Sequence, residues 1–340
     1  MCKIEINFRL AKVSRTRLKN MEIKELPRVF SGHETFPLRQ SWLSKLNKIA
    51  DNSMINKKLF AEDDLVAKFG VGKNMVASMR HWGLASGMFV EQDENLCLTP
   101  HYARLFRNDL VNRGHGQKAY FALDPFFERS DSVWFVHWRL TAFPLRSTTW
   151  FWLFNRISSP TFTKDDLLQS LSIFLEANEG KASDTTLLRD VETCLRSYVP
   201  KLDAKGGVED ASDSLLVELG LLREDKRGFY SFKRGPKPTL SPSFFAFCLA
   251  EYWEKKHQGS NQLSFELISY ADSSPGKVFK LDDESLMDFI DQIEMLTKGL
   301  FSWSSTAGVR QLVRDEKLYQ SLKAKGDEDY LLDMFCRVYE

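Results

Sequence analysis

The chain has 340 residues, and its 47 Lys and Arg against 46 Asp and Glu give a formal net charge of +1. Hydrophobic residues make up 43% and charged residues 27% of the sequence, which is typical of a globular protein and excludes disorder of the whole chain. The 5 cysteines form no Cys-x-x-Cys pair, which excludes a zinc finger or ribbon and argues against a disulfide framework. At about 100–200 residues per domain, the length predicts two to three domains.

The most hydrophobic region, residues 133–157, is interrupted by charged residues and by Pro144. A bilayer span needs about 20 mostly apolar residues, so this region predicts two buried helices joined at Pro144 rather than a membrane segment. The first 30 residues contain no continuous apolar run, so no signal peptide is expected. Together with the scattered cysteines, these features predict a cytoplasmic protein without a membrane partner.

The charges are unevenly distributed along the chain. Residues 1–118 hold 20 basic and 12 acidic residues, whereas residues 119–340 hold 27 basic and 34 acidic ones. A basic N-terminal part predicts that a polyanion binds there, and a solvated basic surface is the alternative. Residues 1–29 are interpreted as a basic arm, because Lys and Arg are spread through a stretch with weak periodicity.

The clearest local pattern follows a helix expected at Gln40–Ala50. It begins with a short helix at 61–69, a glycine turn at 70–72 and a second helix at 73–82. Two short strands follow at 88–90 and 96–98. Two helices across a tight glycine turn, followed by a hairpin, predict a winged-helix-like domain over residues 30–115.

At about 100° per residue, the second helix of this pattern has an apolar side with Met75, Met79 and Trp82. The other side is predicted to face outward and to contact base edges or phosphates of double-stranded DNA through Lys73, Asn74, Ser78, Arg80 and His81. The alternatives are an ordinary solvated face or a protein-docking surface. The acidic turn at 91–95 argues against a standard DNA-binding wing, because phosphate repels it.

A second winged-helix-like element is predicted at residues 206–240, after a helical middle region at 116–205. A helix at 214–219 precedes a hairpin at 223–232. The basic side chains in and after this hairpin are candidate phosphate contacts, with a solvated turn as the alternative: Lys226, Arg227, Lys233, Arg234 and Lys237.

Residues 241–340 are predicted to form a C-terminal helical or winged-helix-like domain. We expect a strand at 277–281, a helix at 283–296, a second strand at 300–303 and a second helix at 309–315. Its acidic face is expected to contact protein rather than DNA. The predicted fold class is therefore mainly α with small β-hairpins, in which winged-helix-like units surround a helical middle region.

The run Ser31-Gly-His-Glu-Thr-Phe-Pro-Leu-Arg39 resembles the opening signature of a bacterial family known as domain of unknown function 4007. Further segments agree with that family in the same order: His137-Trp138, Thr149–Asn155, Leu188–Val191 with Arg196–Pro200, Glu209-Asp210 with Glu218–Leu221, Tyr230–Leu240 and Ser274–Leu281. The resemblance covers residues 29–313 and leaves out the basic arm.

Members of this family resemble the SspB component of bacterial DNA phosphorothioation systems. The resemblance implies action beside a cysteine desulfurase, an ATPase and an ATP-pyrophosphatase-like protein, in defence against phage. It also implies nicking of one DNA strand, with Mg²⁺ as the expected cofactor. The alternatives are a non-catalytic adaptor that docks DNA onto sulfur-transfer or ATPase partners, and a transcription regulator.

The residues themselves contain no strong nuclease signature, and no nucleotide or cluster motif. Gly70-Val-Gly-Lys73 is followed by Asn74 instead of Ser or Thr, so it is not a phosphate-binding loop. The densest group of reactive side chains predicts His33 as a general base, Glu34 as a Mg²⁺ ligand or proton acceptor, and Arg39 as a phosphate clamp. The alternative is that these residues cap the next helix or bind one another.

A second candidate set lies on a later helix and consists of Asp190, Glu192, Arg196 and Tyr198. In this set Tyr198 would be a nucleophile that leaves a covalent DNA end. A purely structural role is the alternative for the whole set. His137, in an apolar helix, is expected to be a core histidine.

Overall fold

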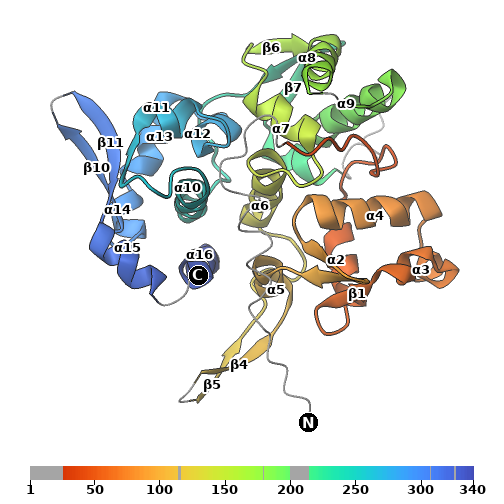
Figure 1. The fold of residues 1–340 in the computed structure, drawn as a ribbon, viewed down its shortest axis with the longest axis horizontal. Helices are drawn as coiled ribbons and strands as arrows, with labels where there is room; N and C mark the ends of the chain where they lie inside the picture. Colours follow the sequence, from red (N-terminus) through yellow and green to blue (C-terminus); the bar gives the residue numbers. More distant parts are fainter. Residues whose placement is uncertain (1–25, 114–115, 179, 200–213, 307, 325–326) are drawn as a thin grey trace.

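The computed structural model describes residues 26–113, 116–178, 180–199, 214–306, 308–324 and 327–340 (Figure 1). Most of the predicted basic arm, residues 1–25, and the acidic pair Glu209-Asp210 lie outside the described residues. From Leu26 onward the chain packs against the body, because Leu26 is buried and the hydroxyl of Thr148 donates to the carbonyl of Pro27.

The first unit, residues 40–98, contains the predicted helices, glycine turn and hairpin in the predicted order, with a strand and a 3-10 helix inserted after the first helix. It comprises α2 (Gln40–Ile49), β1 (Met54–Asn56), the short 3-10 helix η3 (Lys57–Ala61), α3 (Asp63–Phe69), α4 (Lys73–Ala85), β2 (Phe89–Gln92) and β3 (Asn95–Leu98). Gly70 ends α3 with a φ of 65°, a left-handed conformation that glycine adopts at little cost, and this turns the chain into α4. The three strands form an antiparallel sheet in the order β1-β3-β2, with Phe89 opposite Leu98.

The same order recurs in a second unit, residues 148–232. Its elements are α7 (Thr148–Asn155), β6 (Thr161–Thr163), α8 (Lys164–Ala177), α9 (Asp184–Tyr198), the 3-10 helix η4 (Leu215–Leu219), β7 (Leu222–Lys226) and β8 (Phe229–Phe232). The sheet order is β6-β8-β7, so the first strand again pairs with the third. The strand β6, from the predicted middle region, thus pairs with β8 of the predicted second winged-helix-like element.

A third unit, residues 242–314, repeats this pairing with an extra pair of short helices. It contains α10 (Pro242–Lys256), β9 (Gln262–Ser264), α11 (Phe265–Tyr270), α12 (Pro275–Val278), α13 (Asp283–Ile290), α14 (Ile293–Leu296), β10 (Phe301–Thr306) and β11 (Val309–Arg314). The sheet order is β10-β11-β9.

Two predictions in the third unit are wrong. Residues 277–281 do not form a strand, because Ser274 caps α12 with its hydroxyl and Pro275 begins the helix. Residues 309–315 do not form a helix, because β11 pairs with β10 on one side and β9 on the other. This pairing is a tertiary contact that the local pattern does not reveal.

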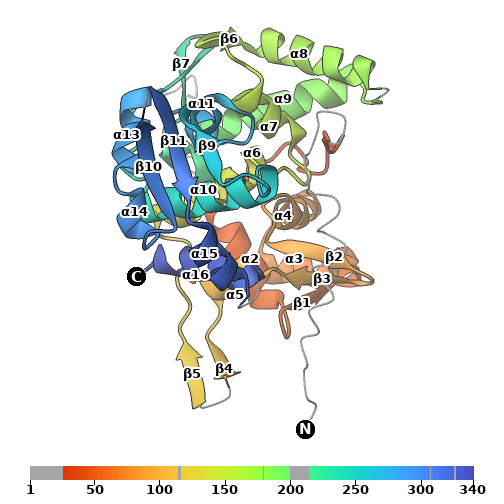
Figure 2. The same cartoon turned by 60° about the vertical axis from the view of Figure 1, so that its left-hand side comes forward.

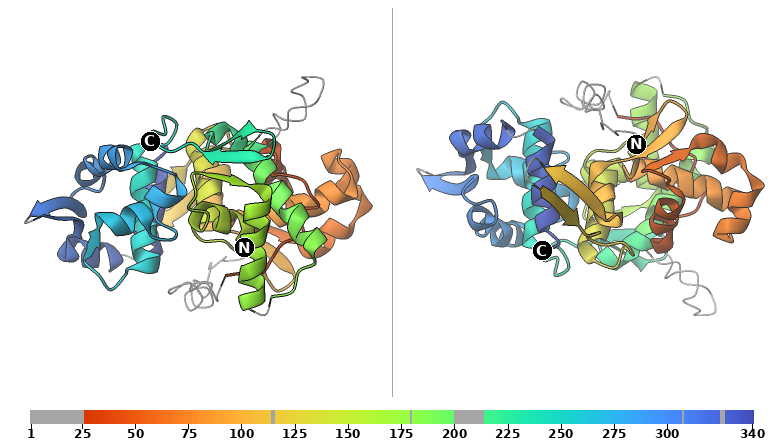
Figure 3. Two further views of the ribbon diagram at one scale, coloured as in Figure 1. Left: turned by 90° about the horizontal axis from the view of Figure 1, so that it is seen from above. Right: turned by 90° about the horizontal axis from the view of Figure 1, so that it is seen from below.

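The remaining elements connect and extend the units. They are α5 (Pro100–Phe106), β4 (Asp109–Arg113), β5 (Gly116–Tyr120), α6 (Ser130–Thr141), α15 (Glu316–Lys323) and α16 (Asp327–Arg337). The β4–β5 hairpin projects away from the body (Figures 1 and 2). Seen from above and below, the third unit and the first unit lie at opposite ends, with α6 and the second unit between them (Figure 3).

The helix α6 is buried almost throughout, and its polar groups bond to different parts of the chain. The Nε2 of His137 lies 3.0 Å from the carbonyl oxygen of Val278 in the third unit, and its Nδ1 lies 2.8 Å from the hydroxyl of Tyr198 in the second. Because a carbonyl can only accept, Nε2 carries the proton and Nδ1 accepts from Tyr198. The prediction of two buried helices around Pro144, one of which holds a core histidine, is confirmed by α6 and α7.

A second buried polar cluster fixes α6 against α10. The carboxylate of Glu251 accepts from the indole of Trp138 at 2.7 Å and pairs with Arg139 at 2.7 Å and Lys255 at 2.9 Å. Burial alone would raise the pKa of Glu251, yet Arg139 and Lys255 hold that pKa far below its usual range.

The architecture is mainly helical with small antiparallel sheets, as predicted. Among the residues that the structure describes, no helix has the length and apolar character to cross a membrane.

Burial lowers the pKa of His137 from 6.5 to about 3, so its protonation opposes folding. Between pH 6.5 and about pH 3 the unfolded chain binds a proton at His137 that the folded chain does not. The free energy of unfolding therefore falls as the pH decreases through this range. We expect this group to contribute a loss of about 1.4 kcal/mol between pH 7.5 and 5.5. In urea unfolding, the His137→Gln variant should lose less stability than the parent over this range by that amount. Parallel losses in both proteins would contradict this prediction.

Candidate functional site

The predicted catalytic residues begin in a tight turn at residues 33–36. The backbone N–H of Phe36 donates to the carbonyl of His33 at 2.8 Å, and the two central residues, Glu34 and Thr35, have φ values of 47° and 62°. This conformation favours Gly or Asn, and for other residues it costs about 1–2 kcal/mol each. The surrounding contacts must therefore hold the turn in place.

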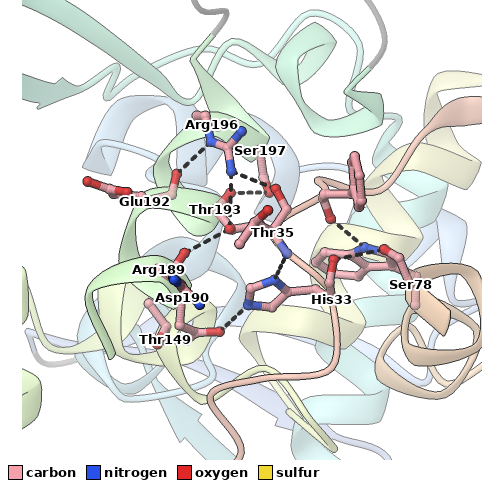
Figure 4. A network of polar contacts seen from close by, with 12 residues as sticks. His33, Thr35, Ser78, Thr149, Arg189, Asp190, Glu192, Thr193, Arg196 and Ser197 are labelled. Carbon is pink, nitrogen blue, oxygen red and sulfur yellow. Dashed lines mark hydrogen bonds and ion pairs between the residues drawn. The ribbon is translucent and has the colours of Figure 1, made fainter. Parts of the chain in front are cut away.

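The imidazole of His33 is buried and fixes the turn from inside (Figure 4). Its Nδ1 accepts from the backbone N–H of Thr35 at 3.0 Å, so the proton lies on Nε2, which donates to Asp190 of α9 at 2.7 Å. The other oxygen of Asp190 accepts from the hydroxyl of Thr149 of α7. Both ring nitrogens of His33 and both oxygens of Asp190 thus have partners within the protein.

Arg196 of α9 holds the other side of the turn. Its guanidinium donates to the carbonyl of Thr35 at 2.6 Å and to the hydroxyl of Thr193 at 3.3 Å (Figure 4). Partial burial lowers the pKa of Arg196, although the negative charge of Glu192 acts to raise that pKa. His33 and Arg196 together bind the N–H and the carbonyl of Thr35, so Glu34 is presented at the exposed tip of a fixed turn.

The helix α4 packs its polar side against this turn. The hydroxyl of Ser78 donates to the carbonyl of His33 at 3.0 Å, and the indole of Trp82 donates to the carbonyl of Phe36 at 2.9 Å. The ring of His81 meets the ring of His33 edge-on at 5.7 Å, and burial, with the nearby His33 and Arg146, lowers the pKa of His81 to about 3. The prediction that Ser78 and His81 face outward is wrong, because both side chains are buried.

The exposed part of α4 is its N-terminal end. Lys73, Asn74 and Ala77 are exposed, and Arg80 is half-exposed. Lys73 forms a 2.8 Å ion pair with Asp63 at the surface. The surface that α4 offers to a partner is therefore its first two turns, which is smaller than the predicted face.

One carboxylate of the acidic segment at 91–95, Glu91 in β2, is surrounded by cations. Glu91 lies 2.8 Å from Arg146 and 3.5 Å from each of Lys57 and Arg80. Partial burial would raise the pKa of Glu91, but Arg146, Lys57 and Arg80 lower it. The charge of Arg80 is therefore shared with Glu91 rather than fully available to a ligand.

Two of the predicted catalytic roles do not fit the geometry. His33 has no unbonded nitrogen that could take a proton from water, so it is a positioning residue rather than a general base. Tyr198 is buried, donates to His137, and has a pKa raised well above its usual value by burial, so it cannot attack DNA. Arg39 precedes α2, and its guanidinium lies 5.8 Å from the ring of Trp42.

The described residues do not assemble a metal site. Within the part of the chain that the structure describes, no three side chains of His, Cys, Asp or Glu come together in a way that could hold a metal ion. Glu34 is exposed, but no second carboxylate joins it in such a group. A Mg²⁺ ion at Glu34 would therefore take its other ligands from water and DNA phosphates, as Mg²⁺ commonly does.

The basic residues in and after the β7–β8 hairpin divide into exposed and buried cations. Lys226, Arg227, Lys233 and Arg234 are exposed. Lys237 is buried, and its amine donates to the carbonyls of Lys233, Gly235 and Lys280 at 2.9, 2.8 and 3.4 Å. Burial lowers the pKa of Lys237 to about 8. The prediction that Lys237 points outward is wrong, because the amine crosslinks its own loop to residue 280.

The comparison with protein families gives a match over residues 30–330 to the family described as Protein of unknown function (DUF4007). The chain is a member of this family. The DUF4007 match begins four residues before Glu34 and so includes the turn, α4 and α9. A search of the curated proteins finds no match.

Two solved structures share the fold of this DUF4007 protein over nearly its whole length. One is a crystal structure of SspB, with a TM-score of 0.69 and 22% identity, covering 92% of this chain and 93% of that chain. The other is a magnesium ion-bound SspB crystal structure, with a TM-score of 0.72 and 22% identity, covering 94% of this chain and 96% of that chain. The chain thus shares the overall fold of these two SspB structures.

Sequence reasoning found both candidate sets but did not join them. His33 and Asp190 are 157 positions apart, and no local signal shows that they form one hydrogen bond. The strained turn was also missed, because Glu and Thr are not typical of a left-handed turn. Only the packing of α9 and α4 around residues 33–36 reveals the network.

The Asp190→Asn variant tests whether the network holds the turn. Asn has a single side-chain carbonyl and cannot accept from both His33 and Thr149, so we expect a loss of about 1–3 kcal/mol in the free energy of unfolding. Cleavage after Glu34 by a glutamate-specific protease should accelerate. The control Asp225→Asn removes a surface carboxylate paired with Arg223 and should change stability by less than about 0.5 kcal/mol. Equal effects in both variants would contradict the assignment.

Proposed function

We propose that this chain is a DNA-binding protein of a bacterial DNA phosphorothioation or related phage-defence system, built from three winged-helix units. The observation that supports this proposal is the repeated order of helix, strand, two helices and two strands, with the first strand paired to the third. That order and pairing are typical of winged helices, many of which bind DNA through the second helix of the helix-turn-helix. The fold shared with SspB supports the pathway.

The first unit is the one best suited to bind duplex DNA. Residues at the N-terminal end of a recognition helix reach base edges, and in α4 this end carries the exposed Lys73, Asn74 and Ala77. Its first turn contains no acidic residue, so the positive end of the helix dipole faces the ligand. In the second unit the corresponding helix, α9, is occupied by Asp190 and Arg196 in the turn network.

The exposed basic tract of the second unit supplies further phosphate contacts in this proposal. Its four cations, Lys226, Arg227, Lys233 and Arg234, lie on or just after the β7–β8 hairpin. Such contacts position the protein on DNA without reading sequence. The third unit is expected to contact protein, since α13 begins with the exposed Asp283 and Glu284. We propose that its partners include the cysteine desulfurase, ATPase and ATP-pyrophosphatase-like proteins of such systems.

We further propose that the protein nicks one DNA strand in a Mg²⁺-dependent reaction. The support is the shared fold with SspB, which has been crystallised with magnesium, and the exposure of Glu34 on a strained and well-held turn. A second function, a non-catalytic adaptor, is supported by a different observation. His33 and Tyr198 are buried and bonded, and no metal-ligand group forms among the described residues.

Duplex binding by α4 is tested with three variants and fluorescence anisotropy. We expect Ala77→Glu to lower affinity for duplex DNA roughly tenfold, because it places a carboxylate against phosphate. Asn74→Ala should cost about 1–3 kcal/mol of binding if it reads a base edge. Ser78→Ala is the matched control: it should lower the free energy of unfolding by about 1 kcal/mol and leave DNA affinity unchanged. An affinity that depends on Ser78 but not on Ala77 would refute the proposed orientation.

Strand nicking is tested on supercoiled plasmid with Mg²⁺ or with EDTA. Relaxed circles should form only with Mg²⁺. The Glu34→Asn variant keeps a residue that tolerates positive φ and removes the charge, so nicking should fall by at least about a hundredfold while affinity stays the same. Plasmid that is bound but never relaxed would favour the adaptor. Undiminished nicking by Glu34→Asn would exclude Glu34 from the reaction.

A further inference from the structure

A groove of about 480 Å³ lies beside α2, and its lining is basic. Its lining includes three cations, two hydroxyls, the buried ring of Trp42 and the exposed ring of Phe126; the cations and hydroxyls are those of Arg39, Lys45, Lys48, Ser41 and Ser44. No carboxylate is among the described residues that line it. A concave surface of this composition attracts a ligand with several negative charges.

The polar residues of the groove form one face of α2. Ser41, Ser44, Lys45 and Lys48 follow the spacing i, i+3, i+4 and i+7, which places them along one side of the helix. The opposite side carries Leu43 and Leu46, which are buried, while the buried Trp42 also contributes to the groove wall. At a rise of 1.5 Å per residue, this polar face is about 10 Å long, enough to follow an extended chain rather than a single small ion.

Two further observations point to an acceptor-rich ligand in the groove. The hydroxyl of Ser44 is buried and has no hydrogen-bond partner, although a buried hydroxyl normally has one. The amine of Lys45 donates to the carbonyl of Phe69 at 3.1 Å, which leaves two of its three N–H groups for another acceptor. At the start of α2 no side chain caps the helix and no acidic residue lies in the first turn.

One of the aromatic rings that line the groove, that of Phe126, is unusually exposed. Phe126 is 65% exposed, and the nearby position Phe121 in the same segment is 77% exposed. A ring next to cations is the combination with which proteins bind single-stranded nucleic acid, because bases stack on the ring while phosphates contact the cations. A base that is paired inside a duplex cannot stack on such a ring.

We propose that this groove binds a single-stranded segment of DNA, with phosphates on Arg39, Lys45 and Lys48 and one unstacked base on Phe126. This inference rests on the proposed function and specifies which part of the DNA the first unit holds. Duplex would lie on α4, and an opened strand would lie along α2. In this proposal, the groove favours binding of DNA in which one strand is displaced from the duplex.

The test compares an oligonucleotide with a blunt duplex, using fluorescence anisotropy and the purified full chain. We expect Phe126→Ala and Lys48→Gln each to weaken binding of a single-stranded oligonucleotide about tenfold and to change duplex affinity less than twofold. Phe126→Tyr keeps a stacking ring and should retain binding. Lys317→Gln, at an exposed lysine of α15, is the matched control for the loss of one charge.

An oligonucleotide that contains 2-aminopurine adds a direct readout of stacking. Its fluorescence should be quenched by the parent and by Phe126→Tyr, and the quenching should be lost with Phe126→Ala. Equal weakening of duplex and single strand, or no change in either, would overturn the groove assignment while duplex binding itself survives. A parent protein that binds neither DNA form would instead overturn the proposed function, and this inference with it. Preference for RNA over DNA of the same sequence would overturn the choice of ligand.

Discussion

The arrangement of the three units depends on the burial of α6. This helix lies at the centre, so each of its polar side chains must find a partner in a neighbouring element or remain unsatisfied at a cost of about 1–3 kcal/mol. His137 illustrates the constraint, because its two ring nitrogens bond to Tyr198 of the second unit and Val278 of the third. The interaction works only with a neutral imidazole, which burial enforces. A central helix with such specific bonds fixes the units relative to one another more tightly than apolar packing alone.

The same principle explains the turn at residues 33–36, where the two central residues adopt a conformation that they do not favour. Its hydrogen bonds come from α4 and α9, and Thr149 of α7 fixes Asp190, so the strained turn is held by contacts from both the first and the second unit. The exposed Glu34 is thereby positioned by buried partners rather than by its own neighbours in sequence. A residue held in this way suits a role that requires a fixed direction, as in binding DNA or a partner.

Much of the fold could be predicted from the sequence, and the failures have physical causes. The glycine turn at Gly70, the apolar stripe of α4 and the hairpin after it are local signals, and all were found. The strand β11 and the sheet partner of β6 were missed, because long-range pairing decided both. In the site, periodicity placed Ser78 and His81 opposite the core face of α4. In the structure the segment at 30–36 covers both side chains, and a helical wheel cannot show such a contact with another segment.

The three units share one topology, but their corresponding helices meet different surroundings. The N-terminal end of α4 is exposed and free of acidic residues, whereas α13 begins with Asp283 and Glu284, which stabilise a helix start yet repel phosphate. The helix α9 is committed to the turn through Asp190 and Arg196. Units of one topology therefore present surfaces of different charge. The exposed end of α4 and most of the basic groove along α2 belong to the first unit, and the exposed cations of the β7–β8 hairpin add a basic surface on the second.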